Sequence, residues 1–407
     1  MLTSKNFSDI VTFTRASAGW SYSAGGVLTQ AAANVPRLDY DPITLAARGL
    51  LLGEQRTNII RNNSMAGAGP GVSPTFWSIP WTSSNGVSWS FVGTGSENGI
   101  PYIDLRLSGT ASAQAYLPIT IEAPGALTIG QAYTLSGFIR LVAGSLAGGS
   151  YGVGEGLRFV ESRSSGGPVY NGINLGTITG APLASQRYSV TKVIDALTTS
   201  VIVSFQVPIS SGQTIDATFR IGAPQLELGA FATSPILTTN AQVTRAVDSA
   251  IITDLSKIGF NPSEGTIVIA GECYNANAVQ QGGLSPRMMV LYSSTNSGES
   301  LSMYRSSAGN QGSASINTGG AGYPMTGPAI PSGTKFKMAF AYKGGDNAIC
   351  VNGAAINAHA QMTMPSGIDR MSLGSQGGAA GLWSGWLTLV NYFPLRVANS
   401  KLQSLTA

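Results

Sequence analysis

The chain has 407 residues, long enough for two or three domains with separate cores, yet charged residues make up only 10% of it, against roughly a quarter in typical domains. The formal net charge of +4 comes from scattered basic residues without a run or a helical stripe, which argues against a nucleic-acid-binding surface. A single histidine argues against an imidazole metal site or a Ser-His triad, and no apolar run approaches the ~20 residues of a membrane-spanning helix.

The first segment, residues 1–60, consists of short extended pieces and lacks the pattern of a domain with its own core. Its recognisable stretches are Phe13-Thr14-Arg15-Ala16-Ser17, Pro36-Arg37-Leu38-Asp39-Tyr40-Asp41, Arg48-Gly49-Leu50-Leu51-Leu52 and Arg56-Thr57-Asn58. Arg37 stands beside Asp39 and Asp41, and Glu54 beside Arg56, so these opposite charges are expected to satisfy one another.

Leu50, Leu51 and Leu52 give this segment more apolar surface than a piece without a core can hide. Packing these three residues around a symmetry axis or against a neighbouring protein would remove them from water. We therefore interpret Leu50, Leu51 and Leu52 as an oligomerisation surface.

The second segment, residues 61–247, is expected to be a β-sandwich, because apolar residues alternate along its strand-like runs. In Ser200–Val207, the residues Val201, Val203, Phe205 and Val207 fall on one face, and Tyr133–Val142 has a similar pattern. A stretch with Pro235 and small polar residues, 234–250, is expected to link it to the third segment.

Three tryptophans of this segment, Trp77, Trp81 and Trp89, lie in Pro/Ser/Asn-rich sequence where loops should protrude. Exposed aromatic rings flanked by polar residues stack on sugar rings, so these residues are candidates for a carbohydrate-binding platform. The alternative is that they cap the core of the sandwich, since aromatic side chains carry large burial energies.

The third segment, residues 248–407, contains the strand order of a jelly roll. A strand at Glu264–Glu272 precedes a hairpin at Lys335–Val351, a further strand starts at Gly385, and a short amphipathic piece at 399–405 ends the chain. Together with the 52 glycines expected of short strands and tight turns, the whole chain is predicted to be all-β, with tandem β-sandwich (jelly-roll) domains after a short extended N-terminal segment.

Cys273 and Cys350 fall on two predicted strands and can bond only if those strands are neighbours; we favour free, buried thiols. Asp346 and Asn347 are the only pair that suggests calcium, and such residues are routine in hairpin turns. No metal and no cofactor are therefore predicted.

No catalytic constellation stands out. Paired carboxylates such as Asp39 with Asp41 are found by chance among 19 acidic residues, and Asp39 and Asp41 are flanked by Arg37 as in a structural ion cluster. No Gly-x-Ser-x-Gly elbow is present. The chain is therefore predicted not to be an enzyme.

Motifs in all three segments resemble those of bacteriophage virion proteins. The first-segment stretches resemble the opening of a family of phage head-spike and tail-fibre proteins, although Gly53 here separates the leucine run from Glu54. Ala-Pro-Gln-Leu-Glu-x-Gly at 223–229, followed by Ser234-Pro235-Ile236 and Thr244-Arg245-Ala246-x-Asp248, resembles the close of carbohydrate-binding-module-like sandwiches in the same proteins. The third segment resembles laminin-G/concanavalin-A-like sandwiches.

The resemblance implies a structural protein of the virion, either a head spike or fibre or a short tail fibre, that decorates the particle and adheres to host-surface polysaccharide. It also implies a homo-oligomer, most simply a trimer, that contacts other capsid or tail proteins. Two alternatives remain open: a tail-associated polysaccharide depolymerase, and a secreted glycan-binding protein, against which the apparent lack of a signal peptide argues.

Overall fold

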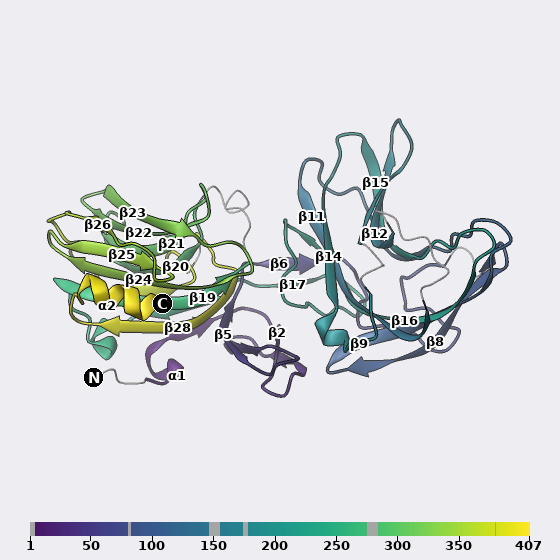
Figure 1. Ribbon diagram of the computed structural model, residues 1–407, viewed down its shortest axis with the longest axis horizontal. Coiled ribbons are helices and arrows are strands. Elements are labelled where there is room, and N and C mark those ends of the chain that lie inside the picture. The colour runs from purple at the N-terminus through teal and green to yellow at the C-terminus, as the bar shows by residue number, and fades with distance from the viewer. Residues whose placement is uncertain (1–4, 80–82, 146–154, 174–177, 275–283, 379) are drawn as a thin grey trace.

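The structure is a computed structural model that describes residues 5–79, 83–145, 155–173, 178–274, 284–378 and 380–407. Strands account for nearly all of its regular structure, so the predicted all-β fold class is confirmed. Figure 1 shows two lobes, with β6 (Arg56–Asn58) and β17 (Val243–Arg245) paired antiparallel between them. Among the described residues, no helix is both long and apolar enough to cross a membrane.

The middle lobe is a sandwich of two antiparallel sheets. One has the order β14 (Arg187–Val193), β11 (Ala132–Ser145), β16 (Thr214–Leu228), β9 (Ile100–Thr110), β8 (Val87–Glu97), β7 (Ser83–Ser84). The other has the order β10 (Ile119–Gly125), β15 (Thr198–Gln206), β12 (Gly156–Arg163), β13 (Val169–Gly172). Val201, Val203 and Phe205 of β15 are completely buried between the sheets, as their alternation predicted.

The C-terminal lobe is a second antiparallel sandwich. Its first sheet has the order β1 (Thr12–Thr14), β18 (Ser249–Ile252), β27 (Arg370–Leu373), β20 (Arg287–Tyr292), β21 (Ser300–Arg305), β22 (Gln311–Thr318), β23 (Ala321–Ala329). Its second has the order β26 (Asn357–His359), β25 (Asn347–Val351), β24 (Lys335–Lys343), β19 (Glu264–Cys273), β28 (Gly385–Phe393), β5 (Ala47–Leu52), β4 (Arg37–Tyr40). The terminal helix α2 (Asn399–Thr406) covers the outer face of the second sheet.

The predicted elements of the third segment are confirmed. The hairpin β24–β25 pairs Met338 with Val351, and β19 pairs with both β24 and β28. Side chains alternate along β24, with Met338 and Phe340 in the main core and Ala339 under α2. The two cysteines are buried and are not bonded to each other, as predicted, and β24 separates their strands.

The first segment, however, is not a separate segment, which corrects the predicted domain boundaries at 1–60 and 248–407. Strand β1 pairs with β18, β5 pairs with β28, and β4 pairs with β5, so three N-terminal strands complete the sheets of the C-terminal sandwich. Local patterns predict a strand but carry no information about a partner hundreds of residues away, and for this reason the boundary was misplaced.

The role predicted for Leu50, Leu51 and Leu52 is also wrong. These three side chains are only 5%, 5% and 2% exposed within a single chain. Leu50 and Leu52 enter the core of the C-terminal sandwich. Leu51 lies on the other face of β5, where its partner in the neighbouring strand β28 is Trp386. The leucine run is therefore covered by the chain's own sheet and needs no second subunit to remove it from water.

The hairpin of β2 (Gly19–Tyr22) and β3 (Leu28–Ala31) contacts the middle lobe instead. Leu28 is buried in a small cluster that includes Phe138 of β11 and Leu183 of the short helix η2 (Leu183–Ser185), and its N–H donates to the carbonyl of Asn98 (2.8 Å). The helices α1 (Phe7–Ile10) and η3 (Leu255–Ile258) are short and pack on the C-terminal lobe. The N-terminal stretch therefore contacts both lobes.

Candidate functional site

A buried cluster of charged side chains joins the N-terminal strands to the C-terminal sandwich, beside its contact with Ser234. Asp248 accepts from Arg15 (Nη1 to Oδ1, 3.2 Å) and from Arg37 (Nη2 to Oδ2, 2.5 Å), and all three side chains are essentially inaccessible. A buried charge is tolerated only when it is paired, and here one carboxylate pairs with two guanidinium groups. The expected pairing of Arg37 with Asp39 and Asp41 is thus wrong, because Asp248 occupies that position.

Arg245 extends this cluster toward the middle lobe. Its guanidinium donates to Ser234 Oγ (2.8 Å) and to the carbonyl of Glu54 (3.0 Å), while burial lowers the pKa of Arg245 to about 10. Arg37 donates to the same Ser234 Oγ (2.7 Å). The expected pair of Glu54 with Arg56 is present. The sequence motifs of the first segment and of residues 234–248 therefore meet at the junction between the lobes.

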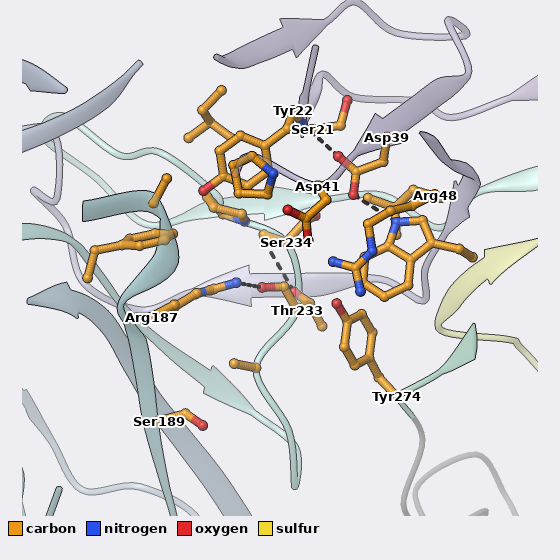
Figure 2. A pocket seen from close by; sticks show the side chains of 18 of the residues that line it. Ser21, Tyr22, Asp39, Asp41, Arg48, Arg187, Ser189, Thr233, Ser234 and Tyr274 are labelled. Carbon is orange, nitrogen blue, oxygen red and sulfur yellow. Dashed lines mark hydrogen bonds between the residues drawn. The ribbon is translucent and has the colours of Figure 1, made fainter. Parts of the chain in front are cut away.

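A cavity of about 730 Å³ lies beside this junction (Figure 2). Its volume falls in the range of roughly 300–1,000 Å³ that is usual for small-molecule sites. Its walls come from β2, from residues 39–51, from β14, from residues 230–235, and from Tyr274 and Trp386 of the C-terminal lobe. Figure 2 shows Arg48, Asp39 and Tyr274 on one side of it, and Arg187 and Ser189 on the opposite side.

Two carboxylates line the cavity. Asp39 accepts from Trp386 Nε1 (Oδ2, 2.7 Å) and from the backbone N–H of Tyr22 (Oδ1, 2.6 Å). Burial raises the pKa of Asp39, and these hydrogen bonds partly oppose that shift. Asp41 behaves differently: the backbone N–H of Thr44 (2.8 Å) lowers the pKa of Asp41, so its carboxylate is an ionised acceptor at the cavity.

Aromatic rings and a guanidinium complete this wall. The Arg48 guanidinium lies 3.3 Å from the centre of the Trp386 ring and donates to both carboxylate oxygens of Glu272 (3.0 and 3.1 Å). Tyr274 meets the same indole edge-on, with ring centres 4.5 Å apart. Trp386 is 3% exposed, so its ring supports the wall and does not itself offer a stacking face.

Arg187 forms the opposite wall. It donates to the carbonyl of Thr233 (2.6 Å) and to Ser136 Oγ (3.1 Å), and its guanidinium lies 5.4 Å from the ring centre of Phe138. Burial lowers the pKa of Arg187, the usual effect of desolvation on a cation. Its Nε has no hydrogen-bond partner among the described residues, and neither does the hydroxyl of Tyr22, which also lines the cavity.

Trp77 and Trp89 do not form the expected tryptophan platform. Trp77 and Trp89 are each 6% exposed within the core of the middle sandwich, and their indole N–H groups donate to the carbonyls of Asn62 (3.0 Å) and Leu117 (2.6 Å). A covered ring offers no face to a sugar, which corrects the carbohydrate-binding role of these two residues in favour of core packing. Trp81 lies outside the described residues.

The hairpin turn suggested for calcium holds an ion pair instead. Asp346 accepts from Arg396 (2.8 Å), and the Asn347 side chain donates to the carbonyl of His359 (3.0 Å). Among the residues that the structure describes, no cluster of His, Cys, Asp and Glu is suited to a metal ion.

Sequence reasoning missed the cavity residues Tyr22, Arg48, Arg187 and Tyr274. Arg48 lies beside the leucine run, and Asp39 and Asp41 stand out as a pair. Nothing in the sequence, however, indicates that these residues line the same cavity. Arg187 and Tyr274 had no local signal, since each is a single polar residue at the end of a strand in a different lobe. Arg187 and Tyr274 stand out only because the fold brings both to the wall of one cavity.

Comparisons with known proteins are weak. No family model matches the chain, and no curated protein is similar to it. Domain 4 of AbnA, an extracellular GH43 arabinanase from Geobacillus stearothermophilus whose structure holds arabinotriose, matches with 10% identity over 40% of this chain and 73% of that one (TM-score 0.30).

Two further solved structures match at the same identity, 10%. They are the LG4-5 domains of the mouse laminin alpha1 chain (70% of this chain, 86% of that one, TM-score 0.27) and the tandem CBM22 domains of Paenibacillus barcinonensis Xyn10C (85% and 98%, TM-score 0.26). At such TM-scores none of the three bears on function, and the fold class rests on the sheets themselves.

Proposed function

We propose that this protein is an adhesive structural component of a bacteriophage particle, and that the cavity between its lobes binds a host-surface glycan. The observation that carries the glycan part is the lining of the cavity, which combines carboxylates, guanidinium groups and tyrosines held by strands of two lobes. Sugar hydroxyls both donate and accept hydrogen bonds, so they suit a wall in which Asp41 accepts and Arg48 donates.

Two features support the virion part. The first-segment motifs that resemble head-spike and tail-fibre proteins include Arg15 and Arg37, whose buried contacts with Asp248 hold the N-terminal strands in the C-terminal sandwich. The low charge of the chain also reduces repulsion between identical copies packed closely in a fibre. A trimer, attached at the head or as a short tail fibre, is the assembly that the resemblance implies.

A polysaccharide depolymerase is the second candidate, and one observation favours it. Asp39 and Asp41 line the same cavity and their pKa values are shifted in opposite directions, the arrangement that separates an acid from a base in catalytic pairs. Both oxygens of Asp39, however, already accept hydrogen bonds, from Tyr22 and Trp386. A carboxyl held in this way is poorly placed to give a proton to a substrate, so we propose binding without turnover.

A glycan array probed with the purified chain tests the glycan part. Asp41→Asn should weaken the strongest signal, whereas Asp254→Asn should leave it unchanged. Asp254 is a matched control, because its carboxylate also accepts a backbone N–H, that of Ser256 (3.0 Å), but belongs to an exposed turn away from the cavity. An array without signal would refute glycan binding.

Imaging of phage particles labelled at the C-terminus of this protein tests the virion part. We expect label at the capsid or tail surface, in groups of three at each attachment site. If purified particles do not contain the protein, the structural role is contradicted, whatever the array shows.

A further inference from the structure

The Arg187 side of the cavity offers hydrogen-bond donors that the protein does not use. An arginine side chain carries five N–H donors, and Arg187 donates two hydrogen bonds, to Thr233 and to Ser136. Its Nε and the Tyr22 hydroxyl, both buried atoms, have no partner among the described residues. Buried donors of this kind are usually satisfied, which points to a ligand group that accepts hydrogen bonds.

The charge on this wall points to an anion. Arg187 makes no ion pair with a described carboxylate, although Glu227 acts on it from a distance. Glu227 is itself completely buried, and its two oxygens accept from the N–H (2.9 Å) and the hydroxyl of Thr233. Arg187 is thus a cation at a cavity wall, and the carboxylate that acts on it is already engaged with Thr233; charge interactions there are stronger than in water.

The opposite wall limits where an anion can lie. Figure 2 shows Asp39 on that side and Asp41 toward the middle of the cavity, and a ligand carboxylate placed beside Asp41 would meet like charge. Arg48, the cation of that wall, is already bound to Glu272 through both carboxylate oxygens. A ligand with an acid group at one end and hydroxyls at the other would therefore be bound in one orientation.

We infer that the cavity binds a carboxylated sugar, such as a hexuronic acid unit of an acidic polysaccharide, with its carboxylate at Arg187 and Tyr22 and its hydroxyls toward Asp41. This inference rests on the proposed glycan binding and specifies its ligand. The planar guanidinium matches the two oxygens of a carboxylate, so recognition by Arg187 discriminates an acidic sugar from its neutral counterpart.

The experiment compares acidic surface polysaccharides with the same polymers after chemical reduction of their carboxyl groups, which leaves the sugar stereochemistry intact. Immobilised polymers are titrated with the full chain. We expect binding to the native polymer to be about ten- to a hundredfold tighter than to the reduced one, the size expected of one charge-assisted contact. Equal binding to both forms would overturn this inference while leaving glycan binding in place; no binding to either would overturn both.

Two variants place the effect in the cavity. Tyr22→Phe removes only the unpartnered hydroxyl, so it should weaken binding to the native polymer with no loss of thermal stability; Tyr170→Phe, on an exposed position of β13, is its control. Arg187→Met should abolish the preference for the native polymer, and Arg106→Met, which removes an exposed ion pair with Asp216, should not. If both Tyr22→Phe and Arg187→Met retain the wild-type preference, the carboxylate does not bind at this wall and the inference fails.

Discussion

Arg37 and Asp248 lie 211 positions apart in the sequence and form an ion pair, 2.5 Å from Nη2 to Oδ2, that solvent does not reach. Arg37 belongs to β4 at the edge of the C-terminal sandwich, and Asp248 lies just before β18 in the other sheet of that sandwich. Because Arg15 binds the second oxygen of the same carboxylate, Asp248 connects three distant parts of the chain.

Removing this carboxylate should destabilise the protein strongly. Asp248→Ala leaves two guanidinium groups buried and unpaired, and breaking a buried pair in this way costs about 3–5 kcal/mol. Equilibrium urea denaturation measures the loss. Asp216→Ala is the control, because it removes an exposed ion pair with Arg106 and should change stability far less. Similar stability of the two variants would show that the buried cluster is not important to folding.

The C-terminal sandwich should require its N-terminal strands. A fragment of residues 248–407 lacks β1, β4 and β5, and so exposes both the edge of β28 and the core that Leu50 and Leu52 cover. We expect it to aggregate or melt without cooperativity, as followed by circular dichroism.

A shortened chain that keeps β1, β4 and β5 tests whether their loss is the cause. The N–H of Asp248 donates to the carbonyl of Gly53 (3.0 Å), so a short glycine loop can join residues 1–55 to 246–407 and omit the middle lobe. This shorter chain should melt cooperatively. A cooperative melt of 248–407 alone, at the same temperature, would restore the boundary that the sequence suggested.

Leu51 should contribute to folding and not to assembly. Truncating a buried leucine costs about 2–5 kcal/mol, so Leu51→Ala should lower the denaturation midpoint while light scattering reports an unchanged oligomeric state. Leu38→Ala, on the neighbouring strand β4, is the control, since Leu38 is 56% exposed. A folded Leu51→Ala variant that has lost its oligomeric state would support the leucine run as a subunit interface after all.

The carboxyl of Asp39 should make stability fall as the pH rises. Burial raises the pKa of Asp39 above its unfolded value of about 4, so the folded state holds the proton more tightly than the unfolded state. Its contribution is therefore most favourable below about pH 4 and is lost as the pH rises through the raised folded pKa.

Thermal melts of the wild type and Asp39→Asn across this pH range isolate that contribution. The melting temperature of the wild type minus that of Asp39→Asn should decrease with rising pH and then level off. Asp254→Asn should show the opposite trend, because a hydroxyl and a backbone N–H of Ser256 lower the pKa of Asp254. A wild-type advantage over Asp39→Asn that grows with pH would contradict the raised pKa.

We expect no hydrolysis of bound polysaccharide. Both oxygens of Asp39 already accept hydrogen bonds, from Tyr22 and Trp386, so this carboxyl is poorly placed to protonate a substrate. Incubation with host capsule or lipopolysaccharide should release no reducing ends. Sustained release that Asp39→Asn or Asp41→Asn abolishes would establish the depolymerase instead.

The sequence by itself determined the fold class and many of the strands. Alternation at Val201, Val203 and Phe205 predicted β15, and the Lys335–Val351 hairpin predicted β24 and β25, because side chains of a half-buried strand follow a period of two whatever the strand pairs with. The first-segment motifs were also recognised from sequence, although their role was not.

Only the tertiary structure decided which strands are partners and where the site lies. The pairing of β5 with β28 covers Leu50, Leu51 and Leu52, and the core of the middle sandwich covers Trp77 and Trp89. Residues that the sequence suggested as binding or subunit interfaces are therefore buried within the chain. The cavity joins Asp39, Arg187 and Tyr274 from distant parts of the chain. Burial and proximity between such residues depend on how sheets pair and pack over long sequence distances, and no local pattern of residues records that pairing.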